Sequence, residues 1–365
     1  MQDNATLTGT LRGLQLFDIA ESIDLQRLQS IIGTIPRREP AFRHPAPDYV
    51  RFERPPITQT IGTQRMMGAD VEVRIRYFDY GVASIELKIP FRAGWHELLK
   101  LANGWMLSPD METFAEQILR GALAKTGETL IKPHEKWISE DYYIVQVDPV
   151  RQGDANLSAE DLLRDRGEEI AQLVRGETQT LSAGERLEVL QSSISYYPTD
   201  LLVVAWVAAF LYDTPQGATP TVDLLEYANT QLLEFRYYDE VLTKVLSDVY
   251  KQLEHRHTMW ARWKMARQAE TLNTIRLDFE ELAERTENAI KFLSDMFNAR
   301  LYRLAAARIG VSDYRSLVTE KLNTARDLYE SMVNEFHQGR AFFLELMVVV
   351  ILLVEIMFLF WHKPV

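Results

Sequence analysis

The first half of the chain shows the two-residue alternation of apolar and polar side chains that is typical of half-buried strands. Residues 71–77, with sequence VEVRIRY, place apolar residues at every second position, and residues 83–89 repeat the pattern after a turn at Asp79–Gly81. The pattern predicts a β-hairpin in which Pro90 ends the second strand. Further strands are expected at 11–17 and 142–147.

Residues 201–212, LLVVAWVAAFLY, are apolar throughout but too short to cross a membrane as a helix. They predict a buried strand or a tight hairpin. Helices are expected between the strands, at 25–32 behind the N-cap Asp24 and at 94–102, 158–175 and 182–193. Strands with intervening helices predict an α+β head domain over residues 1–220, with a mainly antiparallel sheet.

The stretch from Thr221 to Ile309 contains neither proline nor glycine. Apolar residues recur there at steps of three and four, which is coiled-coil spacing. Gly310 gives a stop, and Ser312 with Asp313 gives a new N-cap. We expect a long helical hairpin, or coiled-coil stalk, over residues 221–340. An ordinary helical bundle packed on the domain is the open alternative.

Residues Ala341–Trp361, AFFLELMVVVILLVEIMFLFW, form the most apolar run of the chain. A helix of this length spans roughly 30 Å, the thickness of the hydrocarbon core. The run therefore predicts a single C-terminal transmembrane helix that acts as a tail anchor in a lipid bilayer. Because no signal peptide is visible, we expect the bulk of the chain on the cytoplasmic side of the cell inner membrane.

Two acids interrupt this run, Glu345 and Glu355. An acid within a membrane costs about 2.5–3.5 kcal/mol on insertion scales. We expect both glutamates to be helix-contact residues, with Glu355 facing a second copy or a partner subunit. A protonated acid that faces lipid is the alternative for Glu355.

The net charge of −12 argues against nucleic acid as the main partner, because phosphate binding needs a basic surface. A proline-rich connector over residues 36–56 nevertheless carries a group of candidate basic contacts for anionic lipid or RNA, unless it is a plain connector. These are Arg37, Arg38, Arg43, Arg51 and Arg54.

The sequence carries no standard catalytic signature. Cysteine is absent, which excludes disulfides, thiolate zinc sites and cysteine nucleophiles. There is no phosphate-binding loop, and His96-Glu97 and His134-Glu135 both lack the second histidine of a zinc-protease motif. We therefore predict no catalytic residue, no cofactor and no metal site.

The order of these parts resembles the YagE-like family, which includes the required-for-meiotic-nuclear-division proteins. Three stretches carry the resemblance: LFDIAESIDLQRLQSII near the N-terminus, Tyr77–Val82 in the hairpin, and the tail with Leu344-Glu345 and Val354-Glu355-Ile356. The resemblance implies an α+β domain, a helical region and a membrane helix, with a tethering or assembly role and no established catalysis.

Three functions remain open on these grounds. The first is a non-enzymatic, membrane-anchored scaffold or tethering protein that self-associates or binds a membrane protein partner. The second is a membrane-associated enzyme whose site in the head domain matches no standard motif. The third is a ribosome or RNA tether that uses the connector arginines.

Overall fold

The computed structural model describes residues 6–33, 55–152, 155–254, 272, 274–284 and 296–361. The chain divides into two compact units. The first unit comprises Met1–Tyr238 and Glu280–Arg315, and the second comprises Asp239–Phe279 and Ser316–Val365. Each unit is described by itself below.

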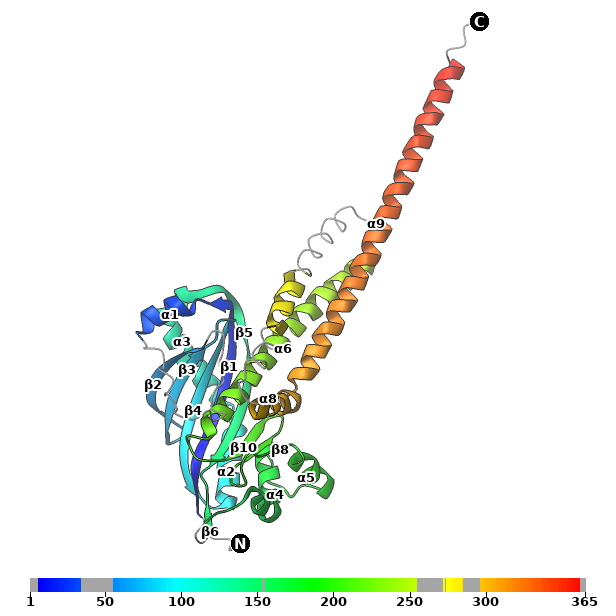
Figure 1. Ribbon diagram of the computed structural model, residues 1–365. Helices are drawn as coiled ribbons and strands as arrows, with labels where there is room; N and C mark the ends of the chain where they lie inside the picture. Colours follow the sequence, from blue (N-terminus) through cyan, green and yellow to red (C-terminus); the bar gives the residue numbers. More distant parts are fainter. Residues whose placement is uncertain are drawn as a thin grey trace. The chain divides into compact units, whose positions relative to one another are not determined.

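The first unit is built on an eight-stranded sheet of order β2-β3-β4-β1-β5-β10-β9-β8 (Figure 1). Its strands are β1 (Leu7–Ile23), β2 (Ile57–Met66), β3 (Ala69–Tyr77), β4 (Val82–Ala93), β5 (Leu130–Val147), β8 (Ser193–Ile194), β9 (Leu201–Val204) and β10 (Ala208–Tyr212). The short strands β6 (Arg151–Gln152) and β7 (Ala155–Asn156) form a separate pair. All neighbours in the large sheet are antiparallel except β5 and β10. The predicted α+β class with a mainly antiparallel sheet is confirmed.

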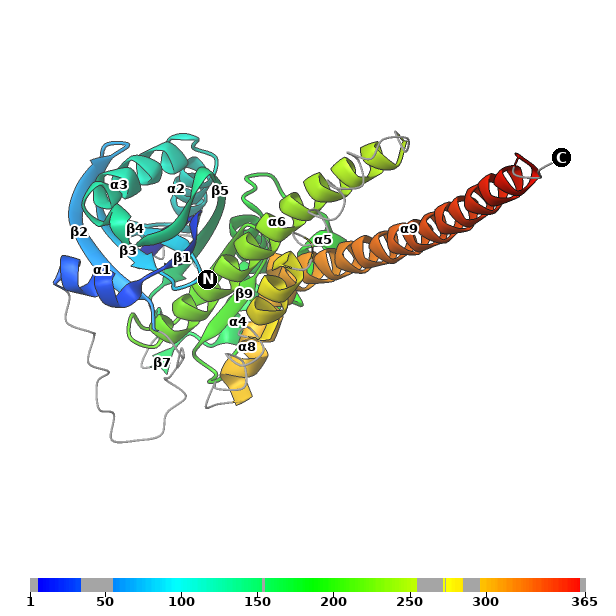
Figure 2. The same ribbon diagram turned by 90° about the horizontal axis from the view of Figure 1, so that it is seen from above.

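Helices cover both faces of this sheet. The helices in the described part of the chain are α1 (Leu25–Ile32), α2 (Trp95–Met106), α3 (Asp110–Thr126), the 3₁₀ turn η1 (Gly127–Thr129), α4 (Ala159–Arg175), α5 (Ala183–Leu190), α6 (Ala218–Glu254), α8 (Met296–Ile309) and α9 (Val311–Trp361), and residues 274–284 are also helical. Figure 2 shows β2, β3, β4, β1 and β5 curving around α2 and α3.

The hydrophobic core lies on the inner, concave face of the sheet. Every second residue of each strand points to this face, as the predicted alternation requires. Val73, Ile75 and Leu87 are fully buried there. They belong to the same cluster as Leu98 of α2 and Leu119 of α3. Burial of this apolar surface is the main stabilising contribution to the unit.

Several predicted local features are confirmed. Helix α1 begins after Asp24, whose carboxylate accepts a hydrogen bond from the Arg27 amide at 3.0 Å. The turn between β3 and β4 uses Gly81 with φ 97°. A Cβ at this position would lie 1.7 Å from the Ala20 carbonyl oxygen, so glycine is required on both counts. Residues 201–212 form the tight hairpin β9–β10.

The prediction that Pro90 ends its strand is wrong, because β4 continues to Ala93. Pro90 pairs with Thr10 of β1, whereas β3 pairs with β4 only over Ala83–Lys88. At Pro90 the strand therefore has a neighbour on one side alone. A proline, which has no N–H to donate, is tolerated at such a position.

The outer face of the sheet is charged and yet buried beneath α6. Arg76 of β3 donates to Glu226 at 2.6 Å and to Asp223 at 2.5 Å, and both acids belong to α6. On the neighbouring strands, Glu86 of β4 accepts from Arg12 of β1 at 2.7 Å and also pairs with Arg74 of β3. The side chains of Glu86 and Glu226 are 1% and 0% exposed. Helix α6 thus brings ion pairs to the sheet in addition to buried apolar side chains of its own, among them Leu225, Leu232 and Phe235.

The pKa shifts follow from this burial. Burial disfavours the charged Arg76 guanidinium, but Glu226 and Asp223 outweigh it and raise the pKa of Arg76. Burial likewise disfavours the Glu86 carboxylate, yet Arg74 and Arg12 outweigh it and lower its pKa. At Glu226 the desolvation caused by burial has a larger effect than the attraction of Arg76, so the pKa of Glu226 is raised. Glu226 therefore depends on Arg76 to remain charged.

The second unit is helical. Buried apolar side chains come from residues 239–254 of α6, from the helical segment near residue 275 and from the first part of α9. They are Leu242, Leu246, Val249, Leu272, Ile275, Phe279, Val318 and Ala325. Lys321 of α9 donates to Asp239 of α6 at 2.5 Å and to Thr243 at 2.6 Å. These contacts join the two long helices within the unit.

The predicted transmembrane helix over residues 341–361 is wrong. Among the residues that the structure describes, no helix has a stretch long and apolar enough to cross a membrane. The apolar run is not an element of its own but the last part of α9, a helix of 51 residues whose first part is strongly charged.

Removing the central cation of the outer face should destabilise the first unit. We expect Arg76→Ala to lower the free energy of unfolding by about 3–5 kcal/mol, because it leaves the buried Glu226 without a counter-charge. Arg65→Ala is the matched control, since the Arg65–Asp70 pair is 74% and 70% exposed and is expected to contribute about 1 kcal/mol or less. Urea unfolding followed by circular dichroism measures both.

An apolar replacement of both partners distinguishes charge pairing from packing. Arg76→Met combined with Glu226→Leu should recover most of the loss, because neither charge is then left buried alone. Equal stabilities of Arg76→Ala and Arg65→Ala would contradict the role given to the buried pair.

Candidate functional site

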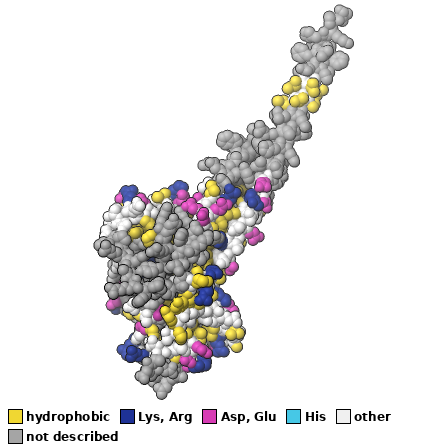
Figure 3. All heavy atoms as spheres, viewed as in Figure 1, with side chains coloured by type: hydrophobic (Ala, Val, Ile, Leu, Met, Phe, Trp, Pro, Cys, Tyr) yellow, Lys and Arg dark blue, Asp and Glu magenta, His cyan; other side chains and the backbone are white. Residues whose placement is uncertain are grey.

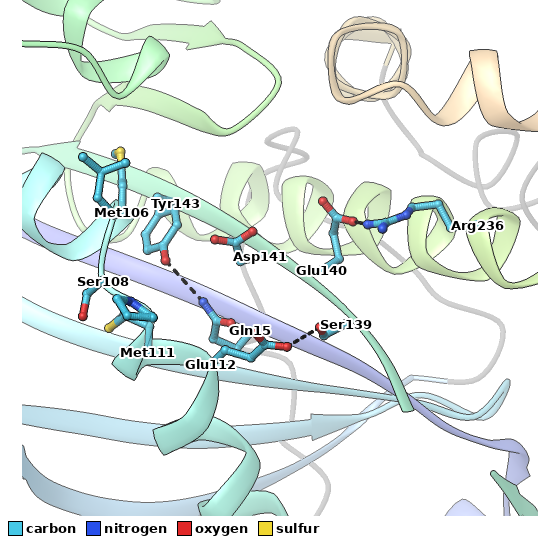
Figure 4. A pocket seen from close by; sticks show the side chains of 12 residues that line it. Gln15, Met106, Ser108, Met111, Glu112, Ser139, Glu140, Asp141, Tyr143 and Arg236 are labelled. Atoms are coloured by element: carbon cyan, nitrogen blue, oxygen red, sulfur yellow. Dashed lines mark hydrogen bonds and ion pairs between the residues drawn. The ribbon is translucent and has the colours of Figure 1, made fainter. Parts of the chain in front are cut away.

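A cavity of about 420 Å³ opens where β1 and β5 meet the connection between α2 and α3 (Figure 4). This volume lies within the range of small-molecule sites. The lining is mixed, with polar side chains from the strands and apolar ones from the helix connection. It consists of Gln15, Met106, Leu107, Ser108, Pro109, Met111, Glu112, Ser139, Glu140, Asp141, Tyr143 and Arg236.

The floor of the cavity is formed by Gln15 of β1 and Tyr143 of β5. Gln15 is 2% exposed and donates a hydrogen bond from Nε2 to the Tyr143 hydroxyl at 3.4 Å. Gly13 leaves the room that this arrangement needs. A Cβ on Gly13 would lie 2.9 Å from Met111 Cε and 3.4 Å from Tyr143 Cε1. The absence of a side chain there lets Tyr143 and Met111 approach each other.

Carboxylates surround the mouth of the cavity. Asp141 is the register partner of Gln15 across the β1–β5 ladder, so both side chains point to the inner face. Glu112 of α3 accepts a hydrogen bond from the Ser139 hydroxyl at 2.5 Å. Glu140 forms an ion pair with Arg236 of α6. Figure 4 shows these side chains arranged around the same opening.

The pKa of Asp141 is raised. Partial desolvation by the cavity wall is the main cause, the Tyr143 hydroxyl opposes it, and repulsion from Glu112 adds to it. Burial also raises the pKa of Tyr143. A carboxyl group with a raised pKa beside a neutral phenol can accept or donate a proton, so the arrangement is chemically capable of acid–base work.

A second titratable pair lies on the outer face. The Asp18 carboxylate of β1 is 2% exposed and lies 3.2 Å from Nε2 of His134 in β5. The His134 ring stacks on Tyr237 of α6 at a centroid distance of 4.9 Å. The hydrogen-bonding influence of Asp18 is the largest cause of a raised pKa at His134, and burial raises the pKa of Asp18.

The residues singled out from the sequence are not among the described residues that line the cavity. The predicted basic contacts Arg37, Arg38, Arg43, Arg51 and Arg54 lie outside the described residues. Glu345 and Glu355 belong to α9, but their side chains are not among those described. Their predicted roles stay predictions, as does the location at the inner membrane. Within the described ranges, no three histidine or acidic side chains are placed to hold a metal ion.

Sequence reasoning missed the cavity because its residues share no motif. The one signal available was Gln15, a polar residue at an inward position between the inward apolar residues Leu11 and Phe17. Its partners come from β5 and from α3, more than 90 residues away along the chain. Nothing local in the sequence brings them together.

Comparisons with known proteins place the first unit in context. Residues 8–219 match the family described as "Uncharacterized protein MJ0711, N-terminal domain". The chain is 22% identical over 190 residues to an uncharacterised protein of Methanocaldococcus jannaschii, covering 51% of this chain and 57% of that one. The chain thus spans little more than half of this relative's length. No solved structure matches. The resemblance to the YagE-like family is not confirmed by these matches.

The Asp18–His134 pair should make stability depend on pH. A histidine whose folded pKa is raised contributes stability that is complete below its unfolded value near 6.5 and lost as pH rises through the folded value. The pKa of Asp18 is also raised in the folded state, so this group likewise makes the folded protein less stable as the pH rises. We expect the unfolding temperature to fall as pH rises from about 6 to 8.

Asp18→Asn removes the negative charge that favours protonated His134 and should flatten this dependence, as followed by calorimetry across the pH range. His96→Gln is the matched control because His96 is exposed on α2. An unchanged slope in Asp18→Asn would exclude the pair as its source.

Proposed function

We propose that this chain, which belongs to the family defined by the N-terminal domain of the uncharacterised protein MJ0711, is a non-enzymatic assembly protein. In this proposal the α+β unit is the working domain, and the helical unit joins it to further copies of the chain. The resemblance to the YagE-like family, with its tethering or assembly role, agrees with this proposal.

The observation that supports it is an apolar stretch of α9. Seven consecutive residues, Met347–Leu353, are between 46% and 60% exposed, and they form the yellow band near the end of the chain in Figure 3. Seven helical residues make about two turns, so apolar side chains surround the whole circumference. A helix that is apolar all round is stable only when it is covered.

A second copy of the same helix is the occupant that we propose. The stretch carries no charge and has no polar face, so any side of one copy is complementary to any side of another. Symmetric association of identical chains is the commonest form of oligomer. Covering a leucine or valine side chain contributes about 1.5–3 kcal/mol, so a few such residues per copy offset much of the entropy cost of association.

A second candidate function is an enzyme with its site in the α+β unit. The cavity and the raised pKa of Asp141 support it, because shifted carboxylates gather at catalytic sites. Steady turnover of a substrate that is lost in both Asp141→Asn and Tyr143→Phe would favour this candidate over a purely binding site. An RNA or ribosome tether through the connector arginines stays a prediction.

The assembly proposal predicts the mass of the particle. We expect the full chain of 42.2 kDa to have at least twice that mass by sedimentation velocity in mild detergent. Leu352→Glu combined with Leu353→Glu should reduce it to a monomer, because each charge would have to be buried at the contact. Leu317→Glu is the matched control, since Leu317 is 39% exposed in the same helix but outside the stretch.

A monomeric wild-type chain would contradict the proposal, as would a double variant that keeps the wild-type mass. Addition of lipid vesicles distinguishes self-association from binding to lipid. A chain that binds vesicles as a monomer through residues 347–353 would also overturn self-association as the role of this stretch.

A further inference from the structure

We propose that the cavity between β1, β5 and the α2–α3 connection binds an organic cation, namely an aliphatic amine with an apolar carbon chain. This inference does not depend on the assembly role of α9, because every residue that lines the cavity belongs to the first unit. It assigns a ligand class to the site from the charge, hydrogen bonding and shape of the lining.

The charge of the lining favours a cation. Three carboxylates line the cavity, whereas Arg236 is the one basic side chain among its described lining residues, and it pairs with Glu140. Glu112 and Asp141 are left with hydroxyl partners, Ser139 and Tyr143. A hydroxyl donates a single hydrogen bond, so each carboxylate keeps lone pairs that can accept N–H groups of a ligand.

Repulsion between the carboxylates of Glu112 and Asp141 also favours binding of a cation. Glu112 contributes to the raised pKa of Asp141, so the two negative charges act on each other across the mouth. A cation placed between them would replace this repulsion by two attractions. Charge-assisted hydrogen bonds of this kind are roughly twice as strong as neutral ones.

The floor supplies a second and independent feature. Gln15 is 2% exposed, and its side chain donates from Nε2 to Tyr143. No described residue donates a hydrogen bond to its carbonyl oxygen Oε1. This oxygen is not one of the fully buried polar atoms, so it is accessible at the floor and can accept an N–H group of a ligand. An ammonium group carries three N–H donors, which suffice for Gln15 and one or both carboxylates.

The opposite wall fits a carbon chain. Met106, Leu107, Pro109 and Met111 come from the end of α2 and the start of α3. Methionine side chains are flexible and adapt to aliphatic groups. The ligand is therefore amphipathic, with its nitrogen at the carboxylates and its carbon chain along this wall. The volume of about 420 Å³ accommodates a chain of several carbons with water.

Titration calorimetry of the full chain with 1,6-diaminohexane tests the inference, and neutral 1,6-hexanediol is the matched ligand. We expect the diamine to bind with a dissociation constant below 1 mM, on the order expected for a small ligand, and the diol to give no heat of binding. Asp141→Asn and Glu112→Gln should each weaken the diamine about tenfold. Glu116→Gln, one turn further along α3 and paired with Arg120, should leave it unchanged.

Folding does not confound the comparison, because Glu112 and Asp141 are exposed enough to be replaced without loss of the core, and circular dichroism checks each variant. The inference is overturned if the wild-type chain binds no diamine, or if Glu116→Gln weakens binding as much as Asp141→Asn. Binding of calcium chloride that depends on Asp141, with none for the diamine, would also overturn it in favour of a metal ion.

Discussion

The first unit depends on the ion pairs that hold α6 against the charged outer face of the sheet. Strands β1, β3 and β4 place Arg12, Arg74, Arg76 and Glu86 on one surface, which a purely apolar helix could not cover without a desolvation cost. The acids of α6 compensate the charge of Arg76, because Asp223 and Glu226 both accept hydrogen bonds from its guanidinium group. A helix with a purely apolar stripe would leave Arg76 buried without its acidic partners, whereas Arg12 and Arg74 pair with Glu86 within the sheet.

This constraint also shapes the candidate site. Strand β5 runs beside β1 for most of its length, and its neighbouring residues point to opposite faces of the sheet. Asp141 therefore turns into the cavity while Glu140 turns toward Arg236 of α6. His134 meets Tyr237 of the same helix further along. Because Glu140 and Arg236 also line the cavity, the contact that fixes α6 on β5 also fixes one side of the candidate site.

Local sequence patterns were enough to predict elements but not the pairing of charges. The alternation over residues 71–77, the cap at Asp24 and the hairpin at 201–212 all depend on near neighbours, and the structure confirms them. The same alternation suggested that Arg74 and Arg76 face water. They are covered instead, because the acid that pairs with Arg76 lies 150 positions away. The apolar run at 341–361 predicted a membrane span from its composition alone, and no helix among the described residues is long and apolar enough to be one.

The central claim is that residues 218–238 of α6 are an integral part of the α+β unit, held by buried charge. Hydrogen–deuterium exchange of the full chain tests it most directly, because amide exchange reports the free energy of local opening. The account predicts that amides of residues 222–235 exchange as slowly as those of β1 and β3. Exchange of this segment within seconds, while the strands remain protected, would contradict it.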